Sequence, residues 1–86
     1  MVGSKSVKKV AIGNLKMRKY LVVYEKTNTG YSAYVPDLPG CIATGDTKEQ
    51  IENLIYEAIQ FHLDGLKQDN MHIPEGTAES EFIVFQ

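Results

Sequence analysis

The chain has 86 residues, one cysteine and a formal net charge of −2 at pH 7. This length allows one small domain, and a single cysteine can form neither an internal disulfide nor a cysteine-based zinc site. No apolar run approaches the roughly 20 residues that span a bilayer, and the first residues lack the apolar core of a secretion signal. We therefore expect a cytoplasmic protein without membrane contact, because an unpaired cysteine fits a reducing compartment.

Charge is distributed unevenly along the sequence. Six of the nine basic residues fall within the first nineteen positions: Lys5, Lys8, Lys9, Lys16, Arg18 and Lys19. Residues 20–86 contain three basic and eleven acidic residues, a net charge of −8. Such a domain repels the phosphate backbone of nucleic acids and attracts a basic protein surface. The alternative interpretation is that the acids only keep a small domain soluble.

The first sixteen residues differ from the remainder. They are polar, basic and contain glycine, and a regular apolar pattern begins only after Met17. We predict that residues 1–16 are a flexible basic leader or an expression remnant, or that the start site is overextended. The folded domain is then residues 17–86.

A β-hairpin is predicted over residues 18–35. In "KYLVVYEK", residues 19–26, β-branched and aromatic side chains alternate between two faces, as in a strand. The next four residues, "TNTG", form a turn in which Asn28 and Gly30 can take positive φ. The alternation returns in "YSAYV" and completes the hairpin.

The stretch "VPDLPG" predicts a corner after the second strand. Pro36 and Pro39 have no N–H to donate, and each disfavours helix in the residue before it. Asp37 is expected to accept hydrogen bonds from nearby backbone N–H groups of the turn. Gly40 frees the backbone for a short third strand, "CIATG", residues 41–45.

A helix is predicted over residues 48–68. Thr47 and Gln50 have the spacing of a capping box at its start, and Asn70 suits the left-handed position after its end. Apolar positions recur with the period of a helix that buries one stripe. This stripe comprises Ile51, Leu54, Ile55, Ala58, Ile59, His62, Leu63 and Leu66.

A final strand is predicted near the C-terminus. Pro74 and Gly76 mark a loop, and "EFIVF" then supplies the apolar residues 82–85. The predicted order is βββαβ. This is an α+β fold in which one helix covers one face of an antiparallel sheet.

Cys41, His62 and His72 are the residue types of a thiol nucleophile and its base. No spacing in the sequence predicts that they lie together, and a catalytic base also needs a group that orients it. We interpret Cys41 as a small apolar residue in a strand and His62 as a packed residue of the helix stripe. No cofactor is expected.

Carboxylates are the other candidate for chemistry. A two-metal nuclease needs several acids that converge from different strands and a helix. Asp37, Asp46 and Glu57 are candidates, but neither the first nor the last predicted strand carries an acid at its centre. We therefore predict no metal site and keep a residual metal-dependent nuclease as a minor alternative.

The segment "GYSAYVPDLPGCIATGDTKEQIENLIYEAIQFHL" resembles the N-terminal domain of HicB-family antitoxins, and the similarity spans residues 20–74. The resemblance implies a degenerate ribonuclease H-like fold without nuclease activity. The shared motif, which we expect to form the corner and the helix start, comprises Gly30, Tyr31, Ala33, Val35, Pro36, Asp37, Leu38, Pro39, Gly40, Cys41, Gly45, Asp46 and Thr47.

The resemblance also implies a partner, a small basic HicA-type toxin that cleaves messenger RNA. An acidic domain can occupy the basic face with which such a toxin grips RNA, so the charge pattern and the resemblance agree in sign. The acids expected to contribute are Glu49, Glu52, Asp64 and Asp69. We also expect a homo-oligomer, dimer or tetramer, because so small a core gains from extra burial.

Many HicB antitoxins continue into a DNA-binding domain, and the sequence ends at Gln86 within the predicted final strand. We therefore expect a short form that does not bind DNA directly. The alternative function is an oligomeric scaffold or protein-binding domain without a toxin partner.

Overall fold

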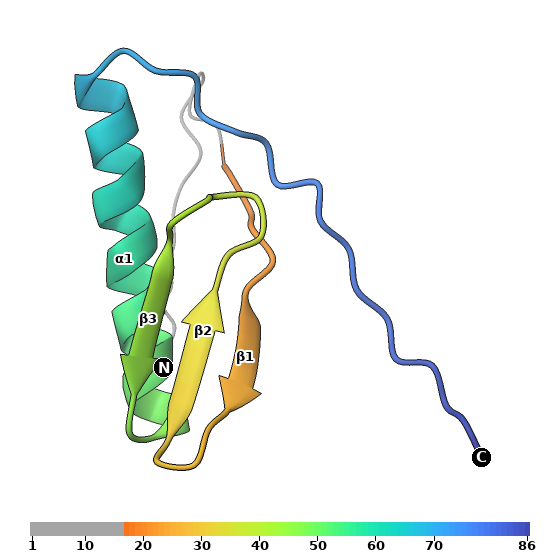
Figure 1. The fold of residues 1–86 in the computed structure, drawn as a ribbon. Helices are drawn as coiled ribbons and strands as arrows, with labels where there is room; N and C mark the ends of the chain where they lie inside the picture. The colour runs from red at the N-terminus through yellow and green to blue at the C-terminus, as the bar shows by residue number, and fades with distance from the viewer. Residues whose placement is uncertain (1–16) are drawn as a thin grey trace.

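The computed structural model describes residues 17–86, so the predicted leader lies outside the described residues. The elements follow in the order β1 (Val23–Lys26), β2 (Tyr31–Tyr34), β3 (Ile42–Gly45) and α1 (Lys48–Gln68). The strands form an antiparallel sheet in the order β1-β2-β3, and α1 covers one face of it (Figure 1). The predicted α+β class is confirmed.

The hairpin forms as predicted, but its first strand is shorter. Pairing of β1 with β2 runs from Lys26 opposite Tyr31 to Val23 opposite Tyr34. Two residues after Tyr34 the chain turns at Pro36, which has no N–H to donate to a neighbouring strand. Residues 19–22 therefore have no partner on β2.

The corner consists of two consecutive turns. Leu38 donates its backbone N–H to the carbonyl of Val35 at 3.0 Å, and Cys41 donates to the carbonyl of Leu38, also at 3.0 Å. A proline occupies the second position of each turn, where its fixed φ fits. Gly40 has φ 86° at the third position of the second turn, a conformation that disfavours a side chain. The predicted corner is confirmed.

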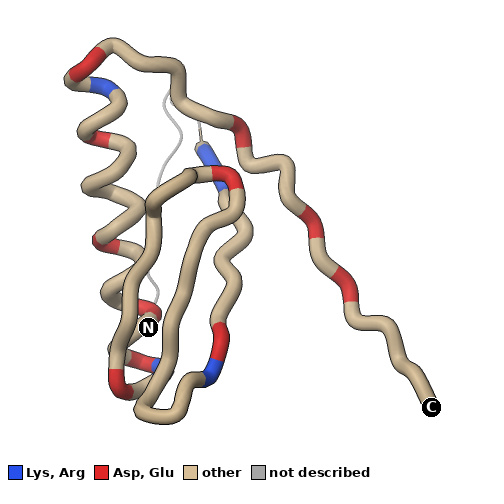
Figure 2. The backbone as a smooth tube through the Cα atoms, viewed as in Figure 1, with Lys and Arg blue, Asp and Glu red and all other residues tan. Residues whose placement is uncertain are grey.

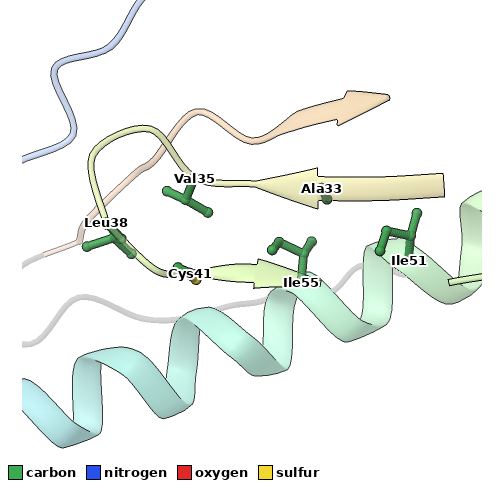
Figure 3. Packing of buried hydrophobic residues seen from close by; sticks show 6 residues of the cluster. All are labelled: Ala33, Val35, Leu38, Cys41, Ile51 and Ile55. Carbon is green, nitrogen blue, oxygen red and sulfur yellow. The ribbon is translucent and has the colours of Figure 1, made fainter. Parts of the chain in front are cut away.

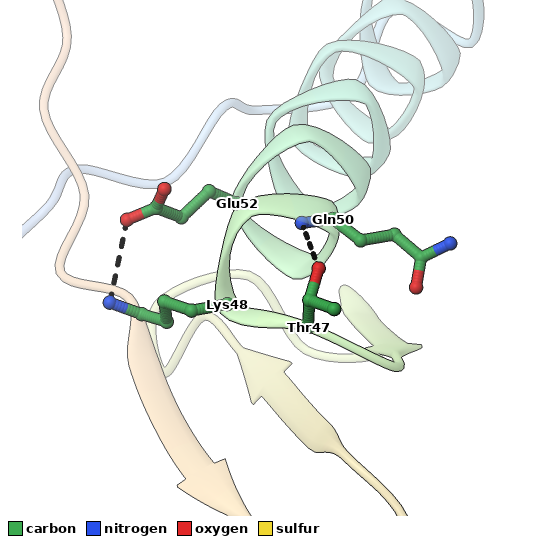
Figure 4. A network of polar contacts seen from close by, with 4 residues as sticks. All are labelled: Thr47, Lys48, Gln50 and Glu52. Atoms are coloured by element: carbon green, nitrogen blue, oxygen red, sulfur yellow. Dashed lines mark hydrogen bonds and ion pairs between the residues drawn. The ribbon is translucent and has the colours of Figure 1, made fainter.

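Both ends of α1 lie where the sequence predicts. The Thr47 hydroxyl accepts the Gln50 N–H at 3.1 Å (Figure 4), while the Gln50 side chain accepts the N–H of Asp46 at 2.5 Å. The Gln50 side chain thus reaches one residue further upstream than in a capping box. At the other end Asn70 has φ 56°, and the next amide donates to the carbonyl of Leu66 at 2.8 Å. These bonds form a Schellman-type stop.

The buried core is small and lies between the sheet and α1. Side chains from β2, the corner and the helix meet there (Figure 3). The core residues are Ala33, Val35, Leu38, Cys41, Ile51 and Ile55. Because four of these six belong to the predicted motif, the motif builds the core as well as the turns.

The predicted final strand is wrong for the single chain. Among the described residues, none after the helix lies in a strand, and the C-terminal segment extends away from the sheet (Figure 1). Val84 is 93% exposed. The observed order is therefore βββα, and the composition of this segment indicates a strand that has no neighbour to pair with.

Candidate functional site

The motif residue Asp37 joins the corner to the C-terminal segment. Its carboxylate accepts the backbone N–H groups of Thr77 at 3.0 Å and of Ala78 at 2.9 Å, and the Thr77 hydroxyl lies 3.3 Å away. Asp37 was expected to bond N–H groups of its own turn, and this expectation is wrong. Its partners come from a segment that reaches the corner only after the helix has reversed the chain.

The other half of the motif brings the hairpin turn against the start of the helix. A Cβ atom at Gly30 would lie 2.3 Å from the Gly45 carbonyl oxygen, so only glycine permits this approach. Gly45 is followed by Asp46 and by Thr47, the N-cap of α1. The motif glycines thus place the turn and the helix start together.

Cys41 has the environment of a packing residue. It is buried in the apolar core cluster, and burial raises the pKa of its thiol. A raised pKa keeps the sulfur protonated, and a protonated thiol is a poor nucleophile. His62 is half-buried on α1 and His72 is exposed after the helix. The interpretation of Cys41 as a small apolar residue is confirmed.

The carboxylates considered for metal chemistry have separate environments. Asp37 holds the C-terminal segment, Asp46 lies exposed before the helix, and Glu57 is exposed on α1. Within residues 17–86, no group of three or more histidine, cysteine or acidic side chains is placed to hold a metal ion. In the same residues, no helix has the length and apolar character to cross a membrane.

The exposed side of α1 combines acidic and aromatic side chains. We call it the acidic helix face; it comprises Glu49, Glu52, Tyr56, Glu57, Phe61 and Asp64. Acidic residues recur along the helix (Figure 2). Tyr56 and Phe61 are 63% and 82% exposed. At 100° per residue, these two aromatic rings lie on either side of a row that holds Glu49 and Asp64.

The first turn of α1 is partly neutralised. Lys48 lies 3.4 Å from the Glu52 carboxylate (Figure 4). Its ammonium also lies 4.5 Å from the centre of the Tyr24 ring. Burial and the nearby Glu52 carboxylate raise the pKa of Tyr24, while Lys48 opposes this shift. Of the predicted acids, Glu49 and Asp64 lie on the face without an ion pair among the described residues, and Asp69 caps the helix end.

Tyr56 and Phe61 were not identified from the sequence as candidate binding residues. Tyr56 and Phe61 fall between the positions of the apolar stripe, which is the signal that assigns them to the exposed side. Exposed aromatic side chains are enriched at protein interfaces. The geometry of this face fits binding of another protein.

A family model matches most of the chain. The model of the family described as HicB-like antitoxin of bacterial toxin-antitoxin system matches residues 20–83. The chain belongs to this family. The match includes the hairpin, the corner and the whole of α1, so it covers the motif and the acidic helix face together.

Individual proteins are also similar in sequence to this chain. A 14.9 kDa protein from the rep-hol intergenic region of Haemophilus phage HP1 is 38% identical over 64 residues, and a UPF0150 protein of Thermoplasma acidophilum is 42% identical over 62 residues. Antitoxin HicB 2 of Photorhabdus laumondii is 29% identical over 69 residues. These matches cover 74%, 71% and 80% of this chain. They cover 48% of the phage protein, 90% of the Thermoplasma protein and 50% of the HicB antitoxin.

Membership of an antitoxin family supports an antitoxin role, and an antitoxin implies a toxin partner. It also supports a non-enzymatic protein, in agreement with the prediction from the residues. The residues that contact the toxin stay a prediction.

Proposed function

We propose that this chain neutralises a HicA-type messenger-RNA endonuclease by covering the face with which the toxin binds RNA. The observation that carries the proposal is the acidic helix face, where two exposed aromatic rings flank carboxylates on one rigid helix. A toxin that grips phosphates presents basic side chains. The carboxylates of the acidic helix face attract such a basic surface and can occupy it in place of RNA.

The aromatic rings supply what charge alone does not. Ion pairs at an exposed surface contribute about 0–1 kcal/mol each, which is too little for a stable complex. Burial of Tyr56 and Phe61 in the toxin would add apolar area, and residues of this kind dominate binding energy at interfaces. We assign the aromatic rings to affinity and Glu49 and Asp64 to steering and orientation.

Glu52 and Asp69, the two other predicted acids, are less suited to direct contact with the toxin. Glu52 already lies 3.4 Å from Lys48 and must exchange that partner for a toxin residue. Asp69 ends the helix and lies beyond the aromatic pair. We propose that both contribute only through the general field of the acidic domain.

Binding measurements across salt concentration test this proposal. The double variant Glu49→Lys, Asp64→Lys is expected to bind the cognate toxin at least tenfold more weakly and to lose most of the salt dependence of the parent. The double variant Glu25→Lys, Glu79→Lys makes the same change in net charge at two exposed positions outside the helix and serves as the control. Affinity that is indifferent to salt and to both helix substitutions would overturn the proposal.

Two further features belong with this function. We propose that the βββα unit is part of a degenerate ribonuclease H-like fold. We also propose that the chain self-associates, because residues 17–86 contribute only six buried apolar side chains to the core. The alternative, an oligomeric scaffold without a toxin, is favoured by the apolar C-terminal segment. Co-purification with a small basic protein encoded by a neighbouring gene separates the two functions.

A further inference from the structure

The C-terminal segment is fixed at its base. The Tyr20 hydroxyl donates to the Pro74 carbonyl at 2.6 Å, and the Asp37 carboxylate accepts the Ala78 N–H at 2.9 Å. Between these bonds the backbone passes tightly over the residues before β1, since a Cβ at Gly76 would lie 1.8 Å from the carbonyl oxygen of Lys19. The segment therefore leaves the domain from a defined place beside the first strand.

Beyond this base the chain presents an apolar strand sequence to solvent. Four consecutive large apolar residues are exposed, and the segment points away from the sheet (Figure 1). They are Phe82, Ile83, Val84 and Phe85. Their β-branched and aromatic composition favours a strand, and apolar residues on both faces are typical of a strand covered on both sides. Exposure of such a run is costly unless another surface covers it.

The edge of β1 in the same chain does not suit this run. Gly76 lies beside Lys19, so a parallel strand continuing from there would bring Phe82 to the level of Glu25, six residues along both chains. Phe85 would then lie beside Asn28, beyond the end of β1. With its base held, the apolar run would overshoot its own sheet.

The outer edge of β1 in a second copy of the chain can pair with this apolar run. Within the described part of the chain, β1 pairs with β2 alone, which leaves its outer edge open to a further strand. We propose that residues 81–86 of one copy add an antiparallel strand to the β1 edge of a second copy, and that the exchange is reciprocal. This inference rests on the proposed self-association and not on the identity of the toxin.

Charge and side-chain pattern select the register of this pairing. With Glu81 opposite Lys26, opposite charges meet where β1 ends. Val84 then lies opposite Val23, and Ile83 lies opposite Tyr24. Because opposed residues point to the same face of a sheet, Ile83 falls on the side that α1 covers and Val84 on the open side.

The open face of the sheet already contains an apolar row for Val84 to extend. Val23 pairs with Tyr34, and Tyr34 pairs with Ile42, so one apolar side chain from each strand lies in line. Ile42 is 63% exposed at the far end of this row. Addition of Val84 would give a row of four, with the new strand covering Val23.

Disulfide trapping tests the register in a Cys41→Ala background, so that only introduced cysteines react. Chains carrying Val84→Cys are mixed with chains carrying Val23→Cys in a glutathione redox buffer. The pairing predicts a disulfide-linked dimer of the two variants, because opposed strand residues lie within disulfide reach. Thr44→Cys on β3 at the opposite edge replaces Val23→Cys as the control and is expected to cross-link at least tenfold less.

The mass of the unmodified full-length chain, measured by light scattering, separates the outcomes. A dimer with selective Val84–Val23 cross-linking supports the exchange. A dimer without that selectivity overturns the exchange and leaves self-association standing, whereas a monomer at all concentrations overturns both. In this register Tyr24 faces the open edge of β1, because Val23 and Glu25 turn their backbone groups toward β2, so Ile83 donates its N–H to the Tyr24 carbonyl. Ile83→Pro, which removes that N–H, is expected to weaken dimerisation at least tenfold without loss of helical circular dichroism; unchanged dimerisation would contradict the pairing.

Discussion

The carboxylate of Asp37 accepts the backbone N–H of Thr77 at 3.0 Å, across forty residues of sequence. Both N–H groups bind the same carboxylate oxygen, so Asp37→Asn keeps an acceptor for them but removes the negative charge that strengthens these hydrogen bonds. We expect the amides of Thr77 and Ala78 to exchange with solvent at least tenfold faster, and the free energy of unfolding to fall by about 1 kcal/mol. Hydrogen exchange read by NMR gives the first quantity and urea unfolding the second.

Asp64→Asn is the matched control for that substitution. It makes the same chemical change on the exposed side of α1, where no hydrogen bond to the C-terminal segment exists. Its amide exchange near Thr77 is expected to equal that of the parent. If the Thr77 amide of Asp37→Asn exchanges as slowly as that of the parent, the Asp37 carboxylate is not what holds the C-terminal segment.

Two glycines give opposite expectations for the same substitution. Gly76→Ala places a Cβ 1.8 Å from the Lys19 carbonyl oxygen, so the crossing beside β1 must open. Gly65→Ala meets nothing within 4 Å on α1 and is expected to raise the free energy of unfolding by about 0.5–1 kcal/mol. Urea unfolding of both variants checks the signs. Equal effects would contradict the close approach at Gly76.

The Cys41 thiol makes stability depend on alkaline pH. Burial raises its pKa in the folded state above the ordinary value of 9.0, so the folded protein favours the protonated thiol. This contribution is fully present below about pH 9 and is lost as pH rises through the folded-state pKa. We expect the free energy of unfolding to decline more steeply above pH 9 in the parent than in Cys41→Ala. Parallel pH profiles of the two proteins would contradict a buried, protonated thiol.

The aromatic residues of the acidic helix face are expected to separate binding from folding. Tyr56→Ala and Phe61→Ala each remove an exposed ring, so thermal unfolding of the free chain should change little. Toxin binding is expected to weaken by about 2 kcal/mol for at least one of them, or about thirtyfold. Calorimetric titration measures this effect. The control is Met71→Ala, which removes a 58% exposed apolar side chain beyond the end of the helix.

Local signals in the sequence were sufficient for the helix and the corner. Thr47 and Asn70 delimit α1 because their hydrogen bonds and φ preferences act within a few residues. The length of β1 was not accessible in this way. It depends on where β2 stops pairing, at Tyr34, and residues 19–22 then receive the C-terminal segment instead of a strand.

The errors arose where a distant segment decides the outcome. The composition around Asp37 correctly predicts a carboxylate that accepts backbone N–H groups, but only the folded chain brings Thr77 to it. The apolar run near Val84 has the composition of a strand, but the predicted strand is absent because a strand needs an edge to pair with. The close crossing of Gly76 over Lys19 directs the run past the edge of its own sheet. Propensity thus predicts the type of a segment, while its partner depends on the geometry of the whole domain.

Cleavage of messenger RNA by the cognate toxin, measured while this chain is titrated in, tests the antitoxin function most directly. Occlusion predicts that cleavage falls in proportion to added chain and stops once every toxin molecule is bound, while the chain alone cleaves nothing. Toxin activity that persists undiminished in excess chain, or RNA cleavage by the chain itself, would contradict the proposed function.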